Sequence, residues 1–308
     1  MNLSLFDLHC DTAYEMLCQK QSLEQNSLAV SLQKANCFTN YVQVMAHWTS
    51  HELNDEDGWN RFLEMCENLK KDPAILCKKA RIVTSIKDMT AVPQLLLAVE
   101  DARILANKES RVQQLYDLGI RILTPLWAGT TCIGGSHNTE KGLTRFGRSA
   151  LRHAVSLGMI PDISHASEQS AQDIFEISSE FQRPVIASHS NAYMICPVSR
   201  NLRDWQIQAI LKSDGMIGLN LYRGFLSKNE NATAKDVLPH IAHFLEMGAE
   251  KHLGLGCDMD GCDLPEDIPD VSALPRLAEL MLQQNYPEGL IYDIFYGNAI
   301  RFFQKHLR

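Results

Sequence analysis

Short apolar runs alternate with longer amphipathic stretches along the chain, and this alternation is the sequence feature that most constrains the fold. Runs this apolar predict strands that are covered on both faces, as in a parallel sheet flanked by helices. About eight such units without a linker favour a single (β/α)8 barrel, the TIM-barrel architecture, over a doubly wound sheet. No glycine-rich dinucleotide-binding fingerprint follows the first run, which also disfavours the doubly wound sheet. We therefore expect residues 1–308 to form one α/β barrel domain.

The expected elements follow this alternation. The expected strands are Leu3–His9, Tyr41–Trp48, Ile82–Thr84, Leu95–Glu100, Ile120–Leu126, Met159–Ser164, Val185–His189, Met216–Asn220 and Leu253–Asp258. The expected helices include Trp59–Lys71, Arg111–Leu118, Gly147–Leu157, Glu168–Ser179, Ala234–Met247 and a C-terminal helix over Phe295–Phe303.

The composition narrows the classes of function. The chain has 29 Lys and Arg against 37 Asp and Glu, a net charge of −8, which argues against nucleic acid or an anionic membrane as the main partner. No apolar stretch reaches the roughly 18–20 residues that a membrane-spanning helix needs. Residues 1–7 show no basic region and no long apolar region, so we expect no signal peptide. The nine cysteines are scattered without a CxxC pair, and we expect reduced thiols in a cytoplasmic protein.

Polar side chains gather where the expected strands end. Because the carboxyl ends of barrel strands meet at one rim, these side chains are expected to lie together there. They are His9, Asp11, Glu100, Asp162, His165, His189, Asp258 and Asp260. Imidazole and carboxylate ligands suit zinc or a similar divalent ion, and a cation removes the repulsion between carboxylates packed on one rim. The pattern therefore predicts a metal hydrolase site.

Each of these residues also has a purely structural interpretation. A single strand-end histidine is more often a hydrogen-bonded structural residue than a ligand. Asp162 fits a hydrogen-bonding partner of a ligand better than a ligand itself, and Asp260 precedes Gly261 in a common turn pair. A thiol nucleophile is disfavoured because Cys10 points to the strand face opposite His9, and no G-x-S-x-G motif is present.

Several ordered motifs resemble those of the renal or membrane dipeptidases, a branch of the metal-dependent amidohydrolases. The matching stretches run nearly from end to end of the chain. They are Asp7–Asp11, Gly142–Gly147, Leu157–Ser167, Pro184–Ser190, Ser199–Asn201, Gly254–Gly261 and Gly297–Arg301.

The resemblance implies a two-metal site in a (β/α)8 barrel. His9 and Asp11 would bind one zinc ion, His165 and His189 the other, and Glu100 would bridge the two. Two divalent ions of this kind, expected to be Zn²⁺, would generate a bridging hydroxide that attacks the peptide bond of a dipeptide.

Two further residues have roles implied by the same resemblance. Arg200 would hold the carboxylate of the dipeptide, and Asp258 would carry the proton of the attacking water. Strand alternation agrees with this choice, because Asp258 shares the inward parity of Gly254 and Gly256 whereas Asp260 lies beyond the strand end. Family members commonly form homodimers, so we expect a homodimer with a dipeptide as substrate, and no nucleic-acid or membrane partner.

The sequence departs from the family at two places. The family's Leu-Thr-x-Thr-His-Asn stretch, whose histidine polarises the scissile carbonyl, is Leu123–Ala128 here, with Trp127 in place of the histidine. Trp127 can donate one hydrogen bond but cannot act as an imidazole. The Gly134–Asn138 loop is the nearest stretch able to supply a donor, so His137 joins Trp127 as a substrate-binding candidate. Asp101 follows Glu100 where the family usually has glycine.

Two other functions remain open at this point. The replacement at Trp127 favours a related binuclear hydrolase that acts on another small amide, a lactam or an ester. A barrel that binds metal without turnover, as a sensor or scaffold, is disfavoured because Asp258 and the whole ligand set are retained.

Overall fold

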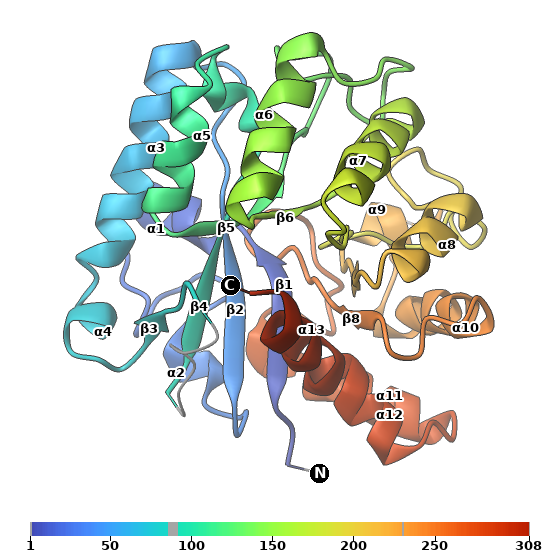
Figure 1. Cartoon of the computed structure of the whole chain (residues 1–308). Helices are drawn as coiled ribbons and strands as arrows, with labels where there is room; N and C mark the ends of the chain where they lie inside the picture. The colour runs from blue at the N-terminus through green and yellow to red at the C-terminus, as the bar shows by residue number, and fades with distance from the viewer. Residues whose placement is uncertain (1, 86–91, 230, 308) are drawn as a thin grey trace.

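The computed structural model describes residues 2–85, 92–229 and 231–307, and a parallel sheet lies at its centre (Figure 1). The strands are β1 Leu5–Cys10, β2 Tyr41–His47, β3 Arg81–Ile82, β4 Gln94–Glu100, β5 Ile120–Thr124, β6 Ile160–Pro161, β7 Ile217–Leu219 and β8 Leu253–Leu255. The α-helices are α1 Thr12–Gln19, α2 Leu32–Ala35, α3 Asp55–Lys70, α4 Pro73–Leu76, α5 Ser110–Asp117, α6 Arg145–Leu157, α7 Glu168–Glu180, α8 Asp204–Lys212, α9 Arg223–Leu226, α10 Val237–Glu246, α11 Pro275–Gln283, α12 Glu288–Tyr292 and α13 Asn298–His306. Short 3₁₀ helices cover Ala102–Leu105, Ala234–Asp236 and Val271–Ala273, and a π-helical turn covers Asp293–Gly297.

The strand order confirms the expected parallel α/β fold. It is β6-β5-β4-β2-β1-β8-β7, with β3 beside β4, and every pairing is parallel. Helices cover the outer side of this curled sheet (Figure 1). In the first half of the chain, each expected strand overlaps a strand of the structure, with ends that differ by a few residues.

The expected closed eight-stranded barrel is present only in part, because the named strands leave the sheet open between β6 and β7. The segment predicted as the strand Val185–His189 spans this opening through two isolated bridges, Asp162 with Ile186 and Ala187 with Ile217. The ladder stops there because the Ser188 amide donates to the Asp162 carboxylate (3.0 Å) rather than to a neighbouring strand.

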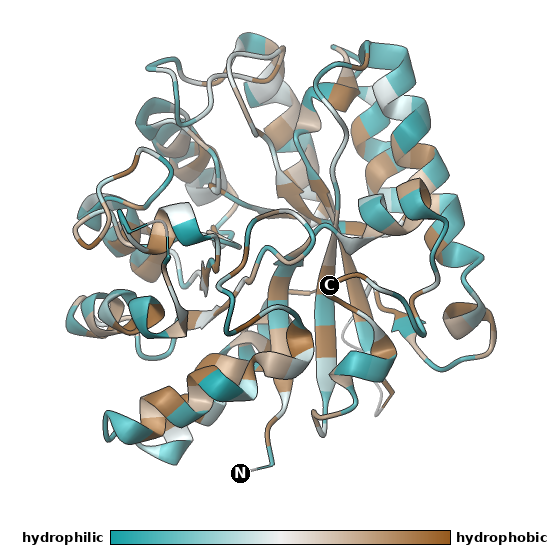
Figure 2. Ribbon diagram, turned by 180° about the vertical axis from the view of Figure 1, so that it is seen from behind, coloured by the Kyte–Doolittle hydropathy of each residue, from teal (hydrophilic) through white to brown (hydrophobic). Residues whose placement is uncertain are grey.

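Alternate strand residues supply two apolar cores. The inner core holds Phe6 and Leu8 of β1 with residues of β2, β4 and β5, and α13 closes it where the Phe303 ring stacks on Phe6 at 4.9 Å between centroids. The larger outer core lies between the sheet and the helices. Figure 2 shows largely apolar strands in the middle of the molecule, surrounded by helices that carry both polar and apolar residues. The strand interior is therefore packed with side chains, and polar groups are left to the carboxyl ends.

Two glycines let three elements meet beside the site. A Cβ on Gly218 of β7 would lie 1.9 Å from the Ser188 carbonyl oxygen, and one on Gly256 would lie 1.7 Å from the same oxygen. Only residues without a side chain fit here, so the 185–189 segment approaches β7 and β8 closely. This approach brings His189 toward the end of β8.

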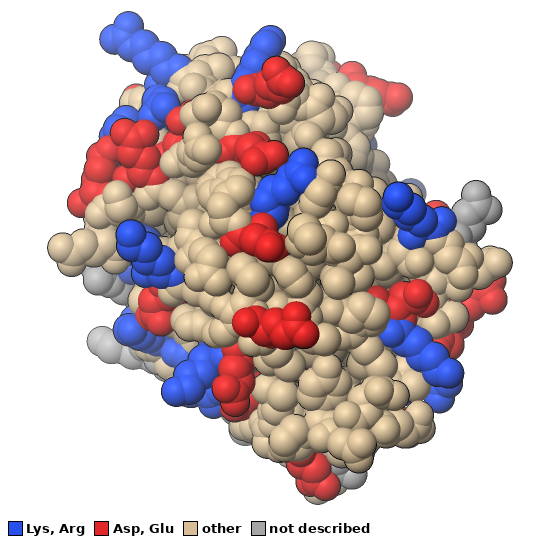
Figure 3. Space-filling view, turned by 90° about the vertical axis from the view of Figure 1, so that its right-hand side faces the viewer, with Lys and Arg blue, Asp and Glu red and all other residues tan. Residues whose placement is uncertain are grey.

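The surface and the cysteines give three further observations. Acidic and basic side chains are interspersed on the face shown in Figure 3. Within residues 2–85, 92–229 and 231–307, no helix combines the length and the apolar character that a bilayer crossing requires. All nine cysteines are unpaired, as their scattered spacing predicts.

Candidate metal centre

The first half of the site is built at the end of β1. His9 lies near the end of that strand and Asp11 immediately precedes α1, while the pairing of β1 with β2 is irregular between Asp7 and Cys10. His9 Nε2 lies 3.5 Å from Asp11 Oδ2 and 3.4 Å from Glu100 Oε2. All three side chains are buried. The sequence prediction that these residues meet is therefore confirmed in the structure.

The second half of the site shares Glu100, the last residue of β4. Glu100 Oε1 lies 3.0 Å from His165 Nε2 and 3.4 Å from His189 Nε2. The two carboxylate oxygens of Glu100 therefore face different partners, with Oε2 toward His9 and Oε1 toward the other two imidazoles. The groups His9–Asp11–Glu100 and Glu100–His165–His189 each bring their ligand atoms within 4.8 Å of one another.

Hydrogen bonds fix which nitrogen of His165 faces the cluster. Burial, with a contribution from Arg200, lowers the pKa of His165, which favours its neutral ring. Its Nδ1 donates to the Trp127 carbonyl oxygen at 3.1 Å, which leaves the Nε2 lone pair toward Glu100. A lone pair facing a carboxylate oxygen at 3.0 Å is repulsive unless a cation lies between them.

The orientation of His189 is set by a chain of hydrogen bonds. Ser188 Oγ donates its proton to Asp162 Oδ2 at 2.5 Å, so it accepts from His189 Nδ1 at 2.7 Å. Asp162 also accepts from Thr124 Oγ1 at 2.6 Å, which holds the carboxylate in place. His189 Nε2 is thus another lone pair turned toward the cluster. Metal-binding histidines are characteristically oriented through their other nitrogen in this way.

The donor set fits divalent cations on three counts. His9 Nε2 and Asp11 Oδ1 are buried and have no hydrogen-bond partner among the described residues. Burial and the charge of Glu100 raise the pKa of Asp11 to about 7, so these carboxylates destabilise one another. Although burial opposes it, Glu100 and Asp11 raise the pKa of His9 well above its ordinary value, so the cluster attracts positive charge. Imidazole nitrogens and carboxylate oxygens are ligands that suit zinc.

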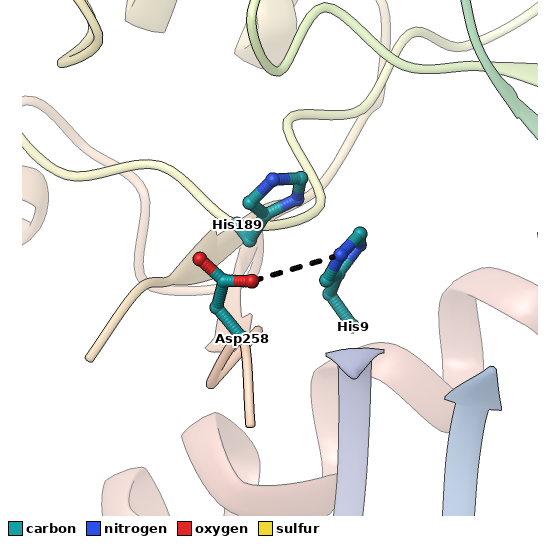
Figure 4. Close-up of side chains that lie close together, drawn as sticks. All are labelled: His9, His189 and Asp258. Carbon is teal, nitrogen blue, oxygen red and sulfur yellow. Dashed lines mark ion pairs between the residues drawn. The ribbon is translucent and has the colours of Figure 1, made fainter. Parts of the chain in front are cut away.

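Asp258 faces the cluster from the loop that follows β8, which ends at Leu255. Its Oδ1 lies 3.8 Å from His9 Nε2, and Figure 4 shows Asp258 and His189 beside His9 at the end of β1. Asp258 Oδ2 accepts from Asn220 Nδ2 at 3.0 Å. Asp260 is engaged elsewhere, with Thr12 Oγ1 and the Ala29 amide each at 2.6 Å. The two aspartates therefore differ in position as expected, but the expected strand Leu253–Asp258 ends at Leu255, so both lie beyond it and the predicted strand alternation does not extend to Asp258.

Backbone strain concentrates in this cluster. His165, Asp258 and Asp260 adopt left-handed φ values of 67°, 60° and 64°. Asp101, at the position where the family usually has glycine, also has a left-handed φ, of 68°. Glycine adopts this conformation without steric strain. Such strain is held only where the surroundings determine it, and it is frequent at functional sites.

Arg200 is buried behind the cluster. Its guanidinium donates to Ser190 Oγ at 2.8 Å and to the His189 carbonyl at 3.0 Å, and burial lowers its pKa to about 10. Arg200 lines a side cavity of about 350 Å³. His137 lines both this side cavity and the main one, and its Nδ1 lies 2.9 Å from Ser199 Oγ. The structure thus places Arg200 and His137, two of the three predicted substrate-binding residues, beside the cluster of His9, Glu100, His165 and His189.

The main cavity, of about 680 Å³, opens directly over the carboxylates Asp11, Glu100 and Asp258. Trp127 lies in its wall, where its backbone orients His165. The indole packs against Trp48 at 5.0 Å between ring centroids. Trp127 thus lies in the cavity wall, in an aromatic environment that the sequence did not indicate.

The sequence pattern was not used to predict several residues of the site, although two of them stand at the end of an expected strand. Asn220 and Trp48 end the expected strands Met216–Asn220 and Tyr41–Trp48, so the strand-end rule pointed to both. Ser188, which links Asp162 to His189, carried no signal, because its contact with Asp162 joins residues 26 positions apart.

Comparisons with known proteins place this geometry in context. The family model described as membrane dipeptidase (Peptidase family M19) matches residues 1–307. An uncharacterised Klebsiella pneumoniae protein encoded in the pqqA 5′ region is 31% identical over 202 residues, covering 62% of this chain and 73% of that protein. Dipeptidase 3 of Macaca fascicularis is 30% identical over 275 residues, covering 86% of this chain and 56% of that protein, so the chain spans about half of that relative.

A solved structure supports the fold. A metallo peptidase from Rhodobacter sphaeroides, liganded with a phosphinate mimic of the dipeptide L-Ala-D-Ala, superposes with a TM-score of 0.91. The superposition covers 100% of both chains at 23% sequence identity. The two chains therefore share their whole architecture.

Proposed function

The chain belongs to the membrane dipeptidase family, Peptidase family M19, and from this premise we propose that it is a metal-dependent dipeptidase. The observation that carries the proposal is the position of buried Glu100, whose Oε2 faces His9 and whose Oε1 faces His165 and His189. A dipeptide is the proposed substrate, since relatives are named as dipeptidases and a structural neighbour binds a dipeptide mimic.

The proposed cofactor is a pair of divalent ions, with Zn²⁺ favoured by the imidazole and carboxylate donors. His9 and Asp11 would hold one ion and His165 and His189 the other, with Glu100 shared. When bound, such ions supply hydroxide at neutral pH and polarise the scissile carbonyl. The orienting bonds to the Trp127 carbonyl and Ser188 keep the ligand nitrogens turned inward before the ions arrive.

Asp258 is the proposed proton carrier. Its Oδ2 is held by Asn220, which leaves Oδ1 facing the cluster near His9 Nε2. A carboxylate in that position can accept a proton from the attacking water and deliver it to the leaving amine. Asp260 lacks this freedom because both its oxygens are engaged by Thr12 and Ala29.

Substrate orientation is assigned to Arg200 and His137. Arg200 would pair with the C-terminal carboxylate, a contact that fixes the length of the substrate. His137 lies between the side cavity and the main cavity, so its free nitrogen can donate to the substrate where Trp127 offers no imidazole.

The presence of Trp127 favours a second candidate, a binuclear hydrolase of another small amide, a lactam or an ester. The two are separated by assaying metal-loaded protein on dipeptides, their C-terminal amides, lactams and esters, with metal content measured on the same sample. We expect cleavage of dipeptides and much slower cleavage of their amides. Cleavage of lactams or esters without cleavage of dipeptides would establish the second candidate, and metal binding without any turnover would establish the scaffold.

A further inference from the structure

One wall of the main cavity is a continuous aromatic surface made of Tyr14, Trp48 and Trp127, which we call the aromatic wall. Its rings touch in series, with Tyr14 and Trp48 at 5.1 Å and Trp48 and Trp127 at 5.0 Å between centroids, both edge to face. His51 stacks on the outer side of Trp127 at 5.6 Å. All three wall residues line the cavity and are only half-buried, so their ring surfaces are available to a ligand.

The aromatic wall and Arg200 follow strands in different parts of the curled sheet. Tyr14, Trp48 and Trp127 follow β1, β2 and β5, which belong to one side of the sheet path. Arg200 follows the 185–187 segment, and its guanidinium lies 5.5 Å from the ring of Phe225, which follows β7. Phe225 also lines the main cavity, whereas Arg200 lines the side cavity, which shares His137 with the main one. Arg200 therefore lies on the β7 side of the cluster of His9, Glu100, His165 and His189, and the wall lies on the side of β1, β2 and β5.

We propose that the aromatic wall is the subsite for the N-terminal side chain of the dipeptide and selects large apolar, above all aromatic, residues there. This rests on the proposed dipeptidase function. If Arg200 holds the C-terminal carboxylate, the scissile bond lies over the cluster and the N-terminal residue extends toward the opposite half of the cavity. The ring faces, together with the Glu15 carboxylate in the same cavity, also favour the N-terminal ammonium group.

The expected selectivity follows from the area that an aromatic side chain buries. Offset and edge-to-face contacts stabilise an aromatic guest beyond the burial of its apolar surface. Hydrophobic pockets discriminate by about 10- to 200-fold for each methylene-sized change, and a shallow, open wall should lie near the lower end. We therefore expect kcat/KM for Phe-Ala to exceed that for Ala-Ala by about 10- to 100-fold.

The test measures two matched substrate series on metal-loaded wild-type protein and on the Trp48→Leu and Trp127→Leu variants. The Phe-Ala to Ala-Ala ratio should fall by about 10-fold in each variant, whereas the Ala-Phe to Ala-Ala ratio should keep its wild-type value. Tyr292→Leu, at an exposed aromatic position on α12, is the control and should change neither ratio. Metal content and a thermal melt establish that each variant is folded and loaded.

A second readout does not require turnover. Dissociation constants of phosphinate dipeptide mimics carrying Phe or Ala at the N-terminal position should differ by a similar factor in wild type and converge in the two wall variants. A selectivity that appears in the Ala-Phe series, or survives both substitutions, would overturn the proposed subsite. Failure of metal-loaded wild type to cleave any dipeptide would instead refute the proposed function, and the mimics would still decide whether the wall binds the side chain.

Discussion

Replacement of Gly261 by alanine probes how tightly the structure fixes the carboxylates of the site. A Cβ at this position would lie 2.0 Å from Asp11 Oδ2 and 2.7 Å from Asp258 Oδ1. Non-bonded heavy atoms make their best contact at roughly 3.5 Å, so the Asp11 carboxylate would have to retreat by about 1.5 Å. The backbone at Gly261 is not left-handed, and the effect of Gly261→Ala is therefore steric rather than conformational.

A displacement of about 1 Å in a catalytic constellation costs on the order of 100-fold in rate, so we expect Gly261→Ala to lose at least about 100-fold in kcat/KM. It should also lose the ion that His9 and Asp11 are proposed to hold, while the fold is retained. The assay combines elemental analysis, a circular dichroism melt and dipeptide hydrolysis. Gly289→Ala is the matched control, because a Cβ on Gly289 meets nothing within 4 Å. A Gly261→Ala protein with full metal content and normal activity would show that the Asp11 and Asp258 carboxylates do not lie as close to Gly261 as the structure has them.

Three further predictions concern the proton carrier, the orienting hydrogen bonds and the pH dependence of stability. Asp258→Asn keeps the size of the side chain but removes its proton transfer, so kcat should fall by about 10²–10⁴-fold with metal content unchanged, and near-normal turnover would remove Asp258 from the mechanism. Ser188→Ala breaks the link from Asp162 to His189 and should weaken metal affinity by about 10- to 100-fold in a chelator competition; unchanged affinity would contradict the assigned orientation of the ring. Burial lowers the pKa of His240 to about 4 from its unfolded value near 6.5, so the stability from its neutral ring is present above pH 6.5 and is lost as pH falls toward 4. In urea unfolding between pH 6.5 and pH 4, the free energy of unfolding of wild type should fall by up to about 3 kcal/mol more than that of His240→Gln. Parallel pH profiles of the two proteins would contradict this.

The fold was predictable from the sequence where apolar runs are long enough to define strands. β2 and β4 lie within a residue or two of their expected ranges, because both are buried along their whole length. The 185–189 segment has the same apolar pattern but forms only isolated bridges, since the Ser188 amide is taken by the Asp162 side chain. That competition joins residues far apart in the sequence and leaves no trace in local hydrophobicity.

The metal-ligand cluster was predictable because the carboxyl ends of parallel strands converge. His9, Glu100 and His189 each end an apolar run, and the fold brings them together. The aromatic wall was not predictable in the same way. The contact between Trp48 and Trp127 depends on how the loops after β2 and β5 lie over the rim, which no local pattern specifies.

If Glu100 joins two cation sites, the metal-to-protein ratio must report both ions. Elemental analysis of remetallated protein should find two divalent ions per chain in wild type. Glu100→Gln should lose ions from both sites together, whereas His165→Ala should lose mainly one, because Glu100 faces His9 through one oxygen and His165 and His189 through the other. One ion or none in wild type, or two ions retained by Glu100→Gln, would contradict the account.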